Sequence, residues 1–65
     1  MELVGRVKTY DQKAKPHEFN VYRRFDGYIV QLDGEQIART ATHLDALQVI
    51  IDKAVLMGLH RGPGT

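Results

Sequence analysis

The stretch FNVYRRFDGYIVQLDGEQIART, residues 19–40, decides the fold of this chain. It contains two Asp-Gly pairs, Asp26-Gly27 and Asp33-Gly34, each set between runs of β-branched and aromatic residues. Asp-Gly is the strongest short-range signal for a β-hairpin, because both central positions of a type I′ turn need a positive φ. Two such turns in succession predict a three-stranded antiparallel meander.

The two turns also predict a register and divide the side chains between two faces. If each Asp-Gly pair is a two-residue loop, opposite residues share a face. The predicted pairs are Phe25 with Tyr28, Arg23 with Val30, Val21 with Leu32, Leu32 with Glu35, Val30 with Ile37 and Tyr28 with Arg39. One face then collects Phe19, Val21, Arg23, Phe25, Tyr28, Val30, Leu32, Glu35, Ile37 and Arg39. The other face collects Asn20, Tyr22, Arg24, Ile29, Gln31, Gln36, Ala38 and Thr40. Because most of the apolar side chains fall on the first face, we expect that face to be covered.

The residues before the meander predict one more strand and a loop. Residues 1–10 (MELVGRVKTY) alternate loosely, and Gly5 suggests a bulge or a close backbone approach. We expect this strand to pair at an edge of the meander or with a second subunit. Residues 11–17 (DQKAKPH) are polar and include a proline, which predicts a loop that carries Lys13 and Lys15.

The residues after the meander predict one helix, from about His43 to Met57. Thr42 and Asp45 have the spacing of a capping box, and Gly58 is placed to end the helix in a left-handed conformation. The apolar arc expected to cover the sheet comprises Leu44, Leu47, Ile50, Ile51, Ala54, Val55 and Met57. Val49 and Leu56 fall outside this arc, seven residues apart, and are either isolated exposed residues or a protein interface. The tail from Leu59 to Thr65 is expected to be frayed.

Length and composition predict a single α+β domain over residues 1–65, in the order β-β-β-β-α, with a three- or four-stranded antiparallel sheet packed on one C-terminal helix. A chain of 65 residues without cysteine has a small core and no disulfide, so we expect a homodimer by default. The formal net charge is only +1. No apolar run approaches the length of a membrane span and the start lacks a secretory pattern, so a soluble cytoplasmic protein without a membrane partner is expected.

The residue pattern does not indicate catalysis, and we expect no enzyme, no cofactor and no metal. The three histidines, His17, His43 and His60, have no partners at the spacing of metal ligands. No glycine-rich loop precedes the helix, and Asp26 and Asp33 are explained by their turns.

The polar face of the sheet is the expected functional surface. Tyr22 can stack on an exposed base, and the amides and guanidinium of the face can bond to base edges. Lys13 and Lys15 in the nearby loop can contact phosphates. The predicted nucleic-acid-binding residues are Tyr22, Arg24, Gln31, Gln36, Lys13 and Lys15. We therefore predict a small non-enzymatic binding module that contacts DNA or RNA. The alternative is a protein-binding inhibitor or adaptor of the antitoxin or phage-accessory type, which would use the same face or an interface at Val49 and Leu56.

Two motifs carry resemblances to known families. Gly27-Tyr28-Ile29-Val30, followed by Thr42-His43-Leu44-Asp45-Ala46-Leu47, resembles the plant AP2 and phage integrase arm-binding type of DNA-binding domain. That resemblance implies a sheet that reads the major groove with Tyr22, Arg24, Gln31 and Gln36. The same helix start, together with Asp26-Gly27-Tyr28-Ile29-Val30, also resembles HicB-like antitoxin domains. The second resemblance implies a protein partner.

Overall fold

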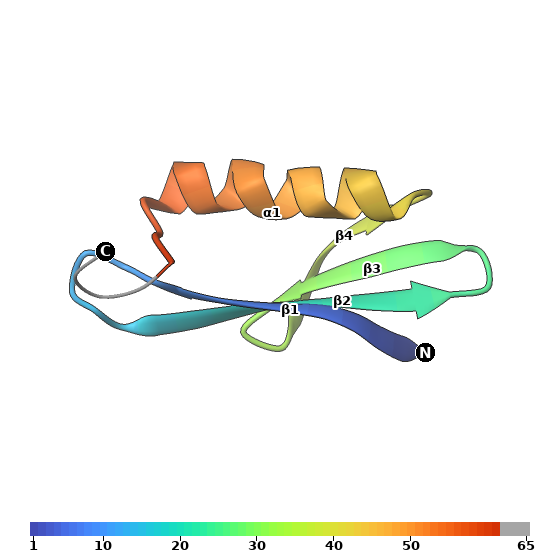
Figure 1. Cartoon of the computed structure of the whole chain (residues 1–65), viewed down its shortest axis with the longest axis horizontal. Helices are drawn as coiled ribbons and strands as arrows, with labels where there is room; N and C mark the ends of the chain where they lie inside the picture. Colours follow the sequence, from blue (N-terminus) through green and yellow to red (C-terminus); the bar gives the residue numbers. More distant parts are fainter. Residues whose placement is uncertain (62–65) are drawn as a thin grey trace.

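Four antiparallel strands lie side by side in chain order, and one helix covers one face of the sheet (Figure 1). This computed structural model describes residues 1–61. Its elements are β1 (Glu2–Tyr10), β2 (Pro16–Arg24), β3 (Gly27–Leu32), β4 (Glu35–Thr40) and α1 (His43–Met57). The predicted α+β meander with a C-terminal helix is confirmed. The predicted edge position of the first strand is also confirmed, because β1 pairs with β2 alone among the named strands. The loop after β1 is shorter than predicted, since Pro16 and His17 already belong to β2.

The first turn lies one residue earlier than predicted, which shifts the register of β2 against β3 by two residues. Arg24 lies opposite Gly27, so that Phe25 and Asp26 form the turn and Gly27 opens β3. Gly27 has φ +143°, and a Cβ there would lie 2.4 Å from the backbone oxygen of Thr40. The glycine is therefore required by the close approach of β4. Because two is an even number, the shift leaves the facing of β2 and β3 unchanged, but Phe25 leaves the core face and is 96% exposed.

The second turn is as predicted, and a bulge follows it. Asp33 and Gly34 have φ values of 53° and 86°, and Leu32 lies opposite Glu35. The register then shifts, so that Ile37 is an extra residue and Val30 lies opposite Ala38 instead of Ile37. A bulge of one residue reverses the facing of everything beyond it. The predicted positions of Ala38, Arg39 and Thr40 are therefore wrong: Arg39 is opposite Ile29, away from the helix, while Ala38 and Thr40 are opposite Val30 and Tyr28.

The helix begins and ends as predicted. The N–H of Asp45 donates to Oγ1 of Thr42 at 3.1 Å, and Gly58 ends the helix with φ 68°. The face that packs on the sheet, however, includes only part of the predicted arc. Ala46 and Ile50 are buried, and Val49 and Ala54 pack against them, whereas five residues of the predicted arc are at least one-third exposed: Leu44, Leu47, Ile51, Val55 and Met57. The helix approaches β3 and β4 most closely, and the small side chain of Ala46 permits that approach.

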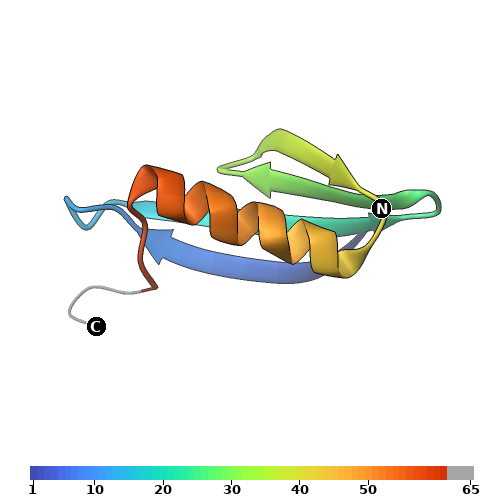
Figure 2. The same cartoon turned by 90° about the horizontal axis from the view of Figure 1, so that it is seen from above.

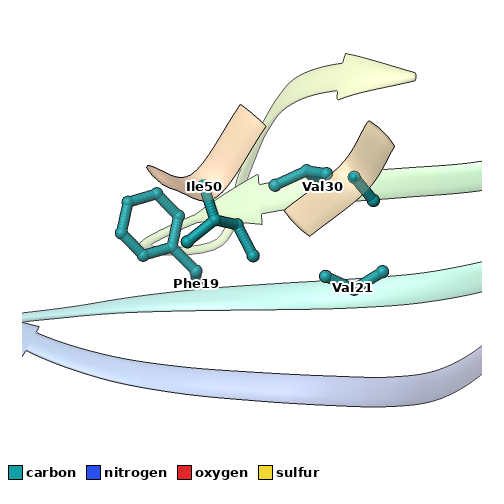
Figure 3. Close-up of a cluster of buried hydrophobic side chains, with 5 residues drawn as sticks. Phe19, Val21, Val30 and Ile50 are labelled. Carbon is teal, nitrogen blue, oxygen red and sulfur yellow. The ribbon is translucent and has the colours of Figure 1, made fainter. Parts of the chain in front are cut away.

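The core lies between α1 and the central strands (Figure 3). Phe19 and Val21 from β2 and Val30 from β3 are fully buried, and the helix contributes Ala46 and Ile50. The helix crosses the strands obliquely (Figure 2).

The segment after the helix is held more firmly than expected. Leu59 packs against the core, and His60 exchanges two backbone hydrogen bonds with Tyr10, at 2.8 and 3.0 Å. The prediction of a frayed tail is thus wrong for these two residues, and residues 62–65 of that tail lie outside the described residues.

Candidate nucleic-acid interface

The face of the sheet turned away from α1, called here the open face, gathers polar and basic side chains from all four strands. The strand ladders show which residues share this face, because opposite residues point the same way. Arg6 lies opposite Asn20 and Lys8 opposite Glu18; Tyr22 lies opposite Ile29, Asn20 opposite Gln31, Ile29 opposite Arg39 and Gln31 opposite Gln36. Arg24 follows Tyr22 by two residues and has the same facing.

Four of the six predicted nucleic-acid-binding residues meet on this face: Tyr22, Arg24, Gln31 and Gln36. Lys13 and Lys15 do not join them. They lie in the loop between β1 and β2, where the backbone N–H groups of both donate to Oδ1 of Asp11, at 2.8 and 2.9 Å. Arg24 is at the other end of β2, nine residues from Lys15, which corresponds to about 30 Å of extended chain. The two lysines and Arg24 therefore mark opposite ends of the molecule.

Three basic residues of the open face were missing from the prediction: Arg6, Lys8 and Arg39. Arg6 and Lys8 alternate with Val7 along β1, a period-two signal that places them opposite the core side. Arg39 could not have been found in this way, since only the bulge at Ile37 turns it to the open face. The face thus carries four basic side chains instead of one.

One end of the open face is hollowed. A depression of about 510 Å³ is lined by Met1, Arg24, Phe25, Ile29 and Gln36. Ile29, only 4% exposed, provides an apolar floor, whereas Phe25 is 96% exposed at the rim. An apolar floor, an aromatic rim and a few directional polar groups are the usual parts of a small-molecule or base site.

Asp26 organises the two guanidinium groups next to the hollow. Its Oδ2 lies 3.1 Å from an Nη atom of Arg39, and its Oδ1 lies 3.9 Å from Nε of Arg24. Because all three side chains are more than one-third exposed, such pairs contribute at most about 1 kcal/mol to stability. The pairs hold the cations in place while leaving them accessible to an anionic ligand.

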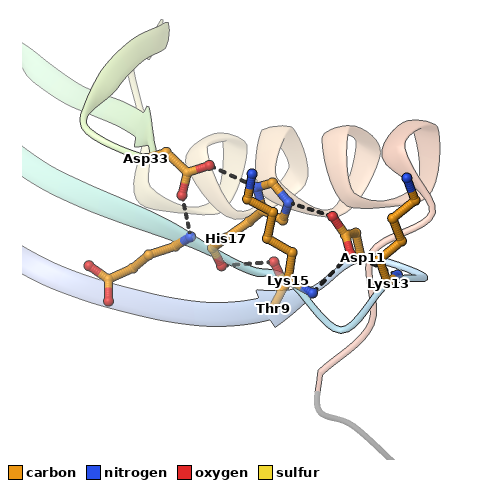
Figure 4. Close-up of polar contacts among 7 residues, drawn as sticks. Thr9, Asp11, Lys13, Lys15, His17 and Asp33 are labelled. Atoms are coloured by element: carbon orange, nitrogen blue, oxygen red, sulfur yellow. Dashed lines mark hydrogen bonds and ion pairs between the residues drawn. The ribbon is translucent and has the colours of Figure 1, made fainter.

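A second polar cluster, formed by Asp11, His17 and Asp33, lies at the opposite end of the sheet (Figure 4). His17 bonds through Nδ1 to Oδ2 of Asp33, at 2.8 Å, and through Nε2 to Oδ2 of Asp11, at 3.1 Å. The hydrogen bonds to Asp33 and then Asp11 raise the pKa of His17 above its ordinary value. The contacts join the turn between β3 and β4 to the loop between β1 and β2, so this cluster is a brace of the fold.

Both carboxylates of the brace are stabilised in their charged form. The pKa of Asp33 is lowered chiefly by the backbone N–H of Glu18, which donates to Oδ1 at 2.9 Å, and next by His17. The pKa of Asp11 is lowered chiefly by the backbone N–H of Lys15 and next by His17. Asp33 therefore not only forms the turn but also binds His17 and the backbone N–H of Glu18.

The predicted protein interface at Val49 and Leu56 divides between two environments. Val49 is half-buried and packs against the core, whereas Leu56 is 82% exposed. Leu56 alone of this pair offers a large accessible apolar surface.

None of the helices described in residues 1–61 combines the length and the apolar character needed to span a membrane. Comparisons of the chain with protein-family models, with curated proteins and with solved structures give no match. The resemblances to the AP2 and integrase type and to HicB-like domains therefore remain predictions, and the function is inferred from the residues of the open face.

Proposed function

We propose that this protein is a non-enzymatic binding module that holds single-stranded nucleic acid, DNA or RNA, on the open face of its sheet. The observation that carries the proposal is the register, which brings basic, aromatic and amide side chains from all four strands to one surface.

The charge of the open face suits a phosphate backbone. Arg6, Lys8, Arg24 and Arg39 outnumber the acids near them, Glu18 and Asp26, so the face is locally basic although the whole chain has a net charge of only +1. The acids Asp45 and Asp52 lie on exposed positions of α1, on the other side of the molecule. A polyanion is therefore attracted to one side and disfavoured on the other.

The hollow favours an unpaired base over a duplex. A base in a duplex is stacked and hides its ring faces, whereas single strands expose rings that stack on aromatic side chains. Phe25 is exposed at the rim of the hollow. Tyr22 lies directly opposite Ile29, the residue that forms the floor of the hollow. The amide of Gln36 can bond to a base edge within the same site.

Two neighbouring arginines of β2 provide a matched test. Arg24 points to the open face, and Arg23, directly opposite Tyr28, points to the helix side, where it pairs with Glu2. Fluorescence anisotropy with labelled single-stranded oligonucleotides should show binding at low salt that weakens steeply as salt rises. Arg24→Ala should reduce the affinity about tenfold or more, whereas Arg23→Ala, with the same change in charge, should reduce it much less. Absence of binding to either DNA or RNA at low salt would contradict the proposal.

The alternative is a protein partner for the same face, as in an antitoxin-type inhibitor or adaptor. Tyr and Arg are enriched at the centres of protein interfaces, and the hollow could take a partner side chain. Capture of one host protein that is abolished by Tyr22→Ala and insensitive to added oligonucleotide would favour this alternative.

A further inference from the structure

The outer side of α1 carries a row of exposed apolar side chains that the fold does not use. Leu44, Leu47, Ile51 and Val55 are 75%, 36%, 55% and 76% exposed. Their spacing of three, four and four residues places them on one line of the helix. We call them the outer row. Six of the ten large exposed hydrophobic residues among those described lie on this single helix of fifteen residues.

The outer row borders a groove between α1 and the edge strand β1. The groove has a volume of about 350 Å³, and its walls include Val7 of β1, Ile50 and Ala54 of the helix, and Leu59. Leu47 and Ile51 line it as well and so belong to both features. A ridge of apolar side chains therefore lies directly beside an apolar depression.

We propose that a second copy of this chain occupies this surface, with the outer row of each copy packed against the groove and outer row of the other. A ridge beside a matching depression is self-complementary under a twofold rotation, which is the geometry of an isologous dimer. A second copy of the chain is present wherever the first copy is, at the same concentration.

The charges agree with a second copy as the occupant. Near a twofold axis a side chain meets its own copy, so a charged group there would repel itself. The outer row contains no charge, and Gln48 beside it is neutral. The charged groups nearest to the surface lie at its border: Asp52 accepts from the side-chain amide of Gln48 at 2.9 Å, and Arg61 is among the residues that line the groove. The charged residues of the helix, Asp45, Asp52 and Lys53, occupy other lines of its surface.

An interface of ordinary size would cover a modest share of the surface of this chain. A standard interface removes about 800 Å² from each partner, which is less than a fifth of the 4535 Å² of accessible surface of this chain. The outer row and groove run along α1, whose fifteen residues extend about 22 Å. The open face lies on the other side of the sheet and stays free in both copies, so the dimer does not depend on the nucleic-acid proposal.

Sedimentation velocity from micromolar to millimolar concentration tests this proposal on the full chain. The wild type should form a dimer, and Ile51→Asp should raise its dissociation constant about thirtyfold or more. Leu56→Asp is the matched control, because Leu56 is 82% exposed but lies off the outer row, and it should leave the dimer intact. Circular dichroism of each variant confirms that the fold is retained.

The absence of cysteine permits an independent second measurement. Single cysteines placed at the four positions of the outer row should yield a disulfide-linked dimer at one position or more under mild oxidation, and Leu56→Cys should not. A wild type that stays monomeric to millimolar concentration overturns the proposal, even if the outer row captures another protein. A dimer that survives Ile51→Asp unchanged and forms no disulfide from any of the four positions overturns it too.

Discussion

Arg39 lies directly opposite Ile29, and its guanidinium reaches Oδ2 of Asp26 at 3.1 Å. This position depends on a single extra residue, since Ile37 is the bulge that reverses the facing of the end of β4. Without the bulge, Arg39 would point toward the helix and the hollow would lose one of the two cations beside it. The bulge in the edge strand β4 therefore adds one positive charge to the open face.

Arg39→Gln is expected to weaken single-strand binding and to reduce its salt dependence. Loss of one phosphate contact should lower the slope of log affinity against log salt by about 0.7. The fold should tolerate the change, because the exposed pair with Asp26 contributes at most about 1 kcal/mol. Lys53→Gln on the helix makes the same change in net charge and serves as the control. If both variants reduce the salt slope equally, the phosphate contacts are not on the open face.

Phe25→Ala tests whether Phe25 stacks on a base, because the substitution should reduce binding without affecting the stability of the fold. Phe25 is 96% exposed, so truncation should change the free energy of unfolding by less than about 0.5 kcal/mol. A base stacked on an aromatic ring contributes about 1 to 3 kcal/mol, so the affinity for single strands should fall about fivefold or more. An abasic oligonucleotide should bind the wild type and the variant alike. Equal losses for intact and abasic oligonucleotides would show that Phe25 does not stack on a base.

Local sequence signals predicted the strands and the helix of this fold well. The features that they did not predict are those that depend on contacts between residues far apart in the chain. The helix from His43 to Met57 was predictable because its ends are set by Thr42 and Gly58 through contacts within one turn. The turn at Asp33-Gly34 was predictable for the same reason. The first turn was misplaced because the glycine at position 27 is required by the close approach of Thr40, thirteen positions away, and not by the turn itself.

The same distinction explains the errors at the candidate site. Tyr22, Arg24, Gln31 and Gln36 were predicted because alternation along a strand survives an even shift in register. Arg39 was misplaced because no local feature of the sequence marks the bulge at Ile37. The helical wheel favoured the most apolar arc, yet the helix turns the slimmer side of Ala46 toward the sheet and leaves the outer row exposed.

Gly27→Ala is expected to destabilise the fold strongly. An added Cβ would lie 2.4 Å from the backbone oxygen of Thr40, and φ +143° is strained for any residue with a side chain. The cost should be about 1 to 3 kcal/mol or more, measured by urea denaturation. Gly5→Ala is the control, because a Cβ there meets Val21 at an ordinary 3.8 Å. If the two variants have equal unfolding midpoints, the close approach of β4 to Gly27 is incorrect.

The brace of Asp11, His17 and Asp33 predicts a maximum of stability at mildly acidic pH. The raised pKa of His17 contributes stability that is complete below 6.5, its ordinary value, and is lost as the pH rises through the higher folded value. The lowered pKa values of Asp11 and Asp33 contribute stability that is present above 3.8 and is lost as the pH falls through their folded values. The free energy of unfolding should therefore be greatest between these limits and decline on both sides.

His17→Gln removes the group responsible for the decline on the alkaline side. The glutamine can keep a hydrogen bond to Asp33 but cannot acquire a charge, so the melting temperature should vary less between about pH 5 and about pH 8 than it does in the wild type. Asp33→Asn should lower stability at mildly acidic pH, because Asp33 holds both His17 and the backbone N–H of Glu18. Asp52→Asn on the helix makes the same change in charge and controls for electrostatics at long range. Parallel melting curves for the wild type and His17→Gln across this pH range would mean that the imidazolium is not held between the two carboxylates in the folded protein.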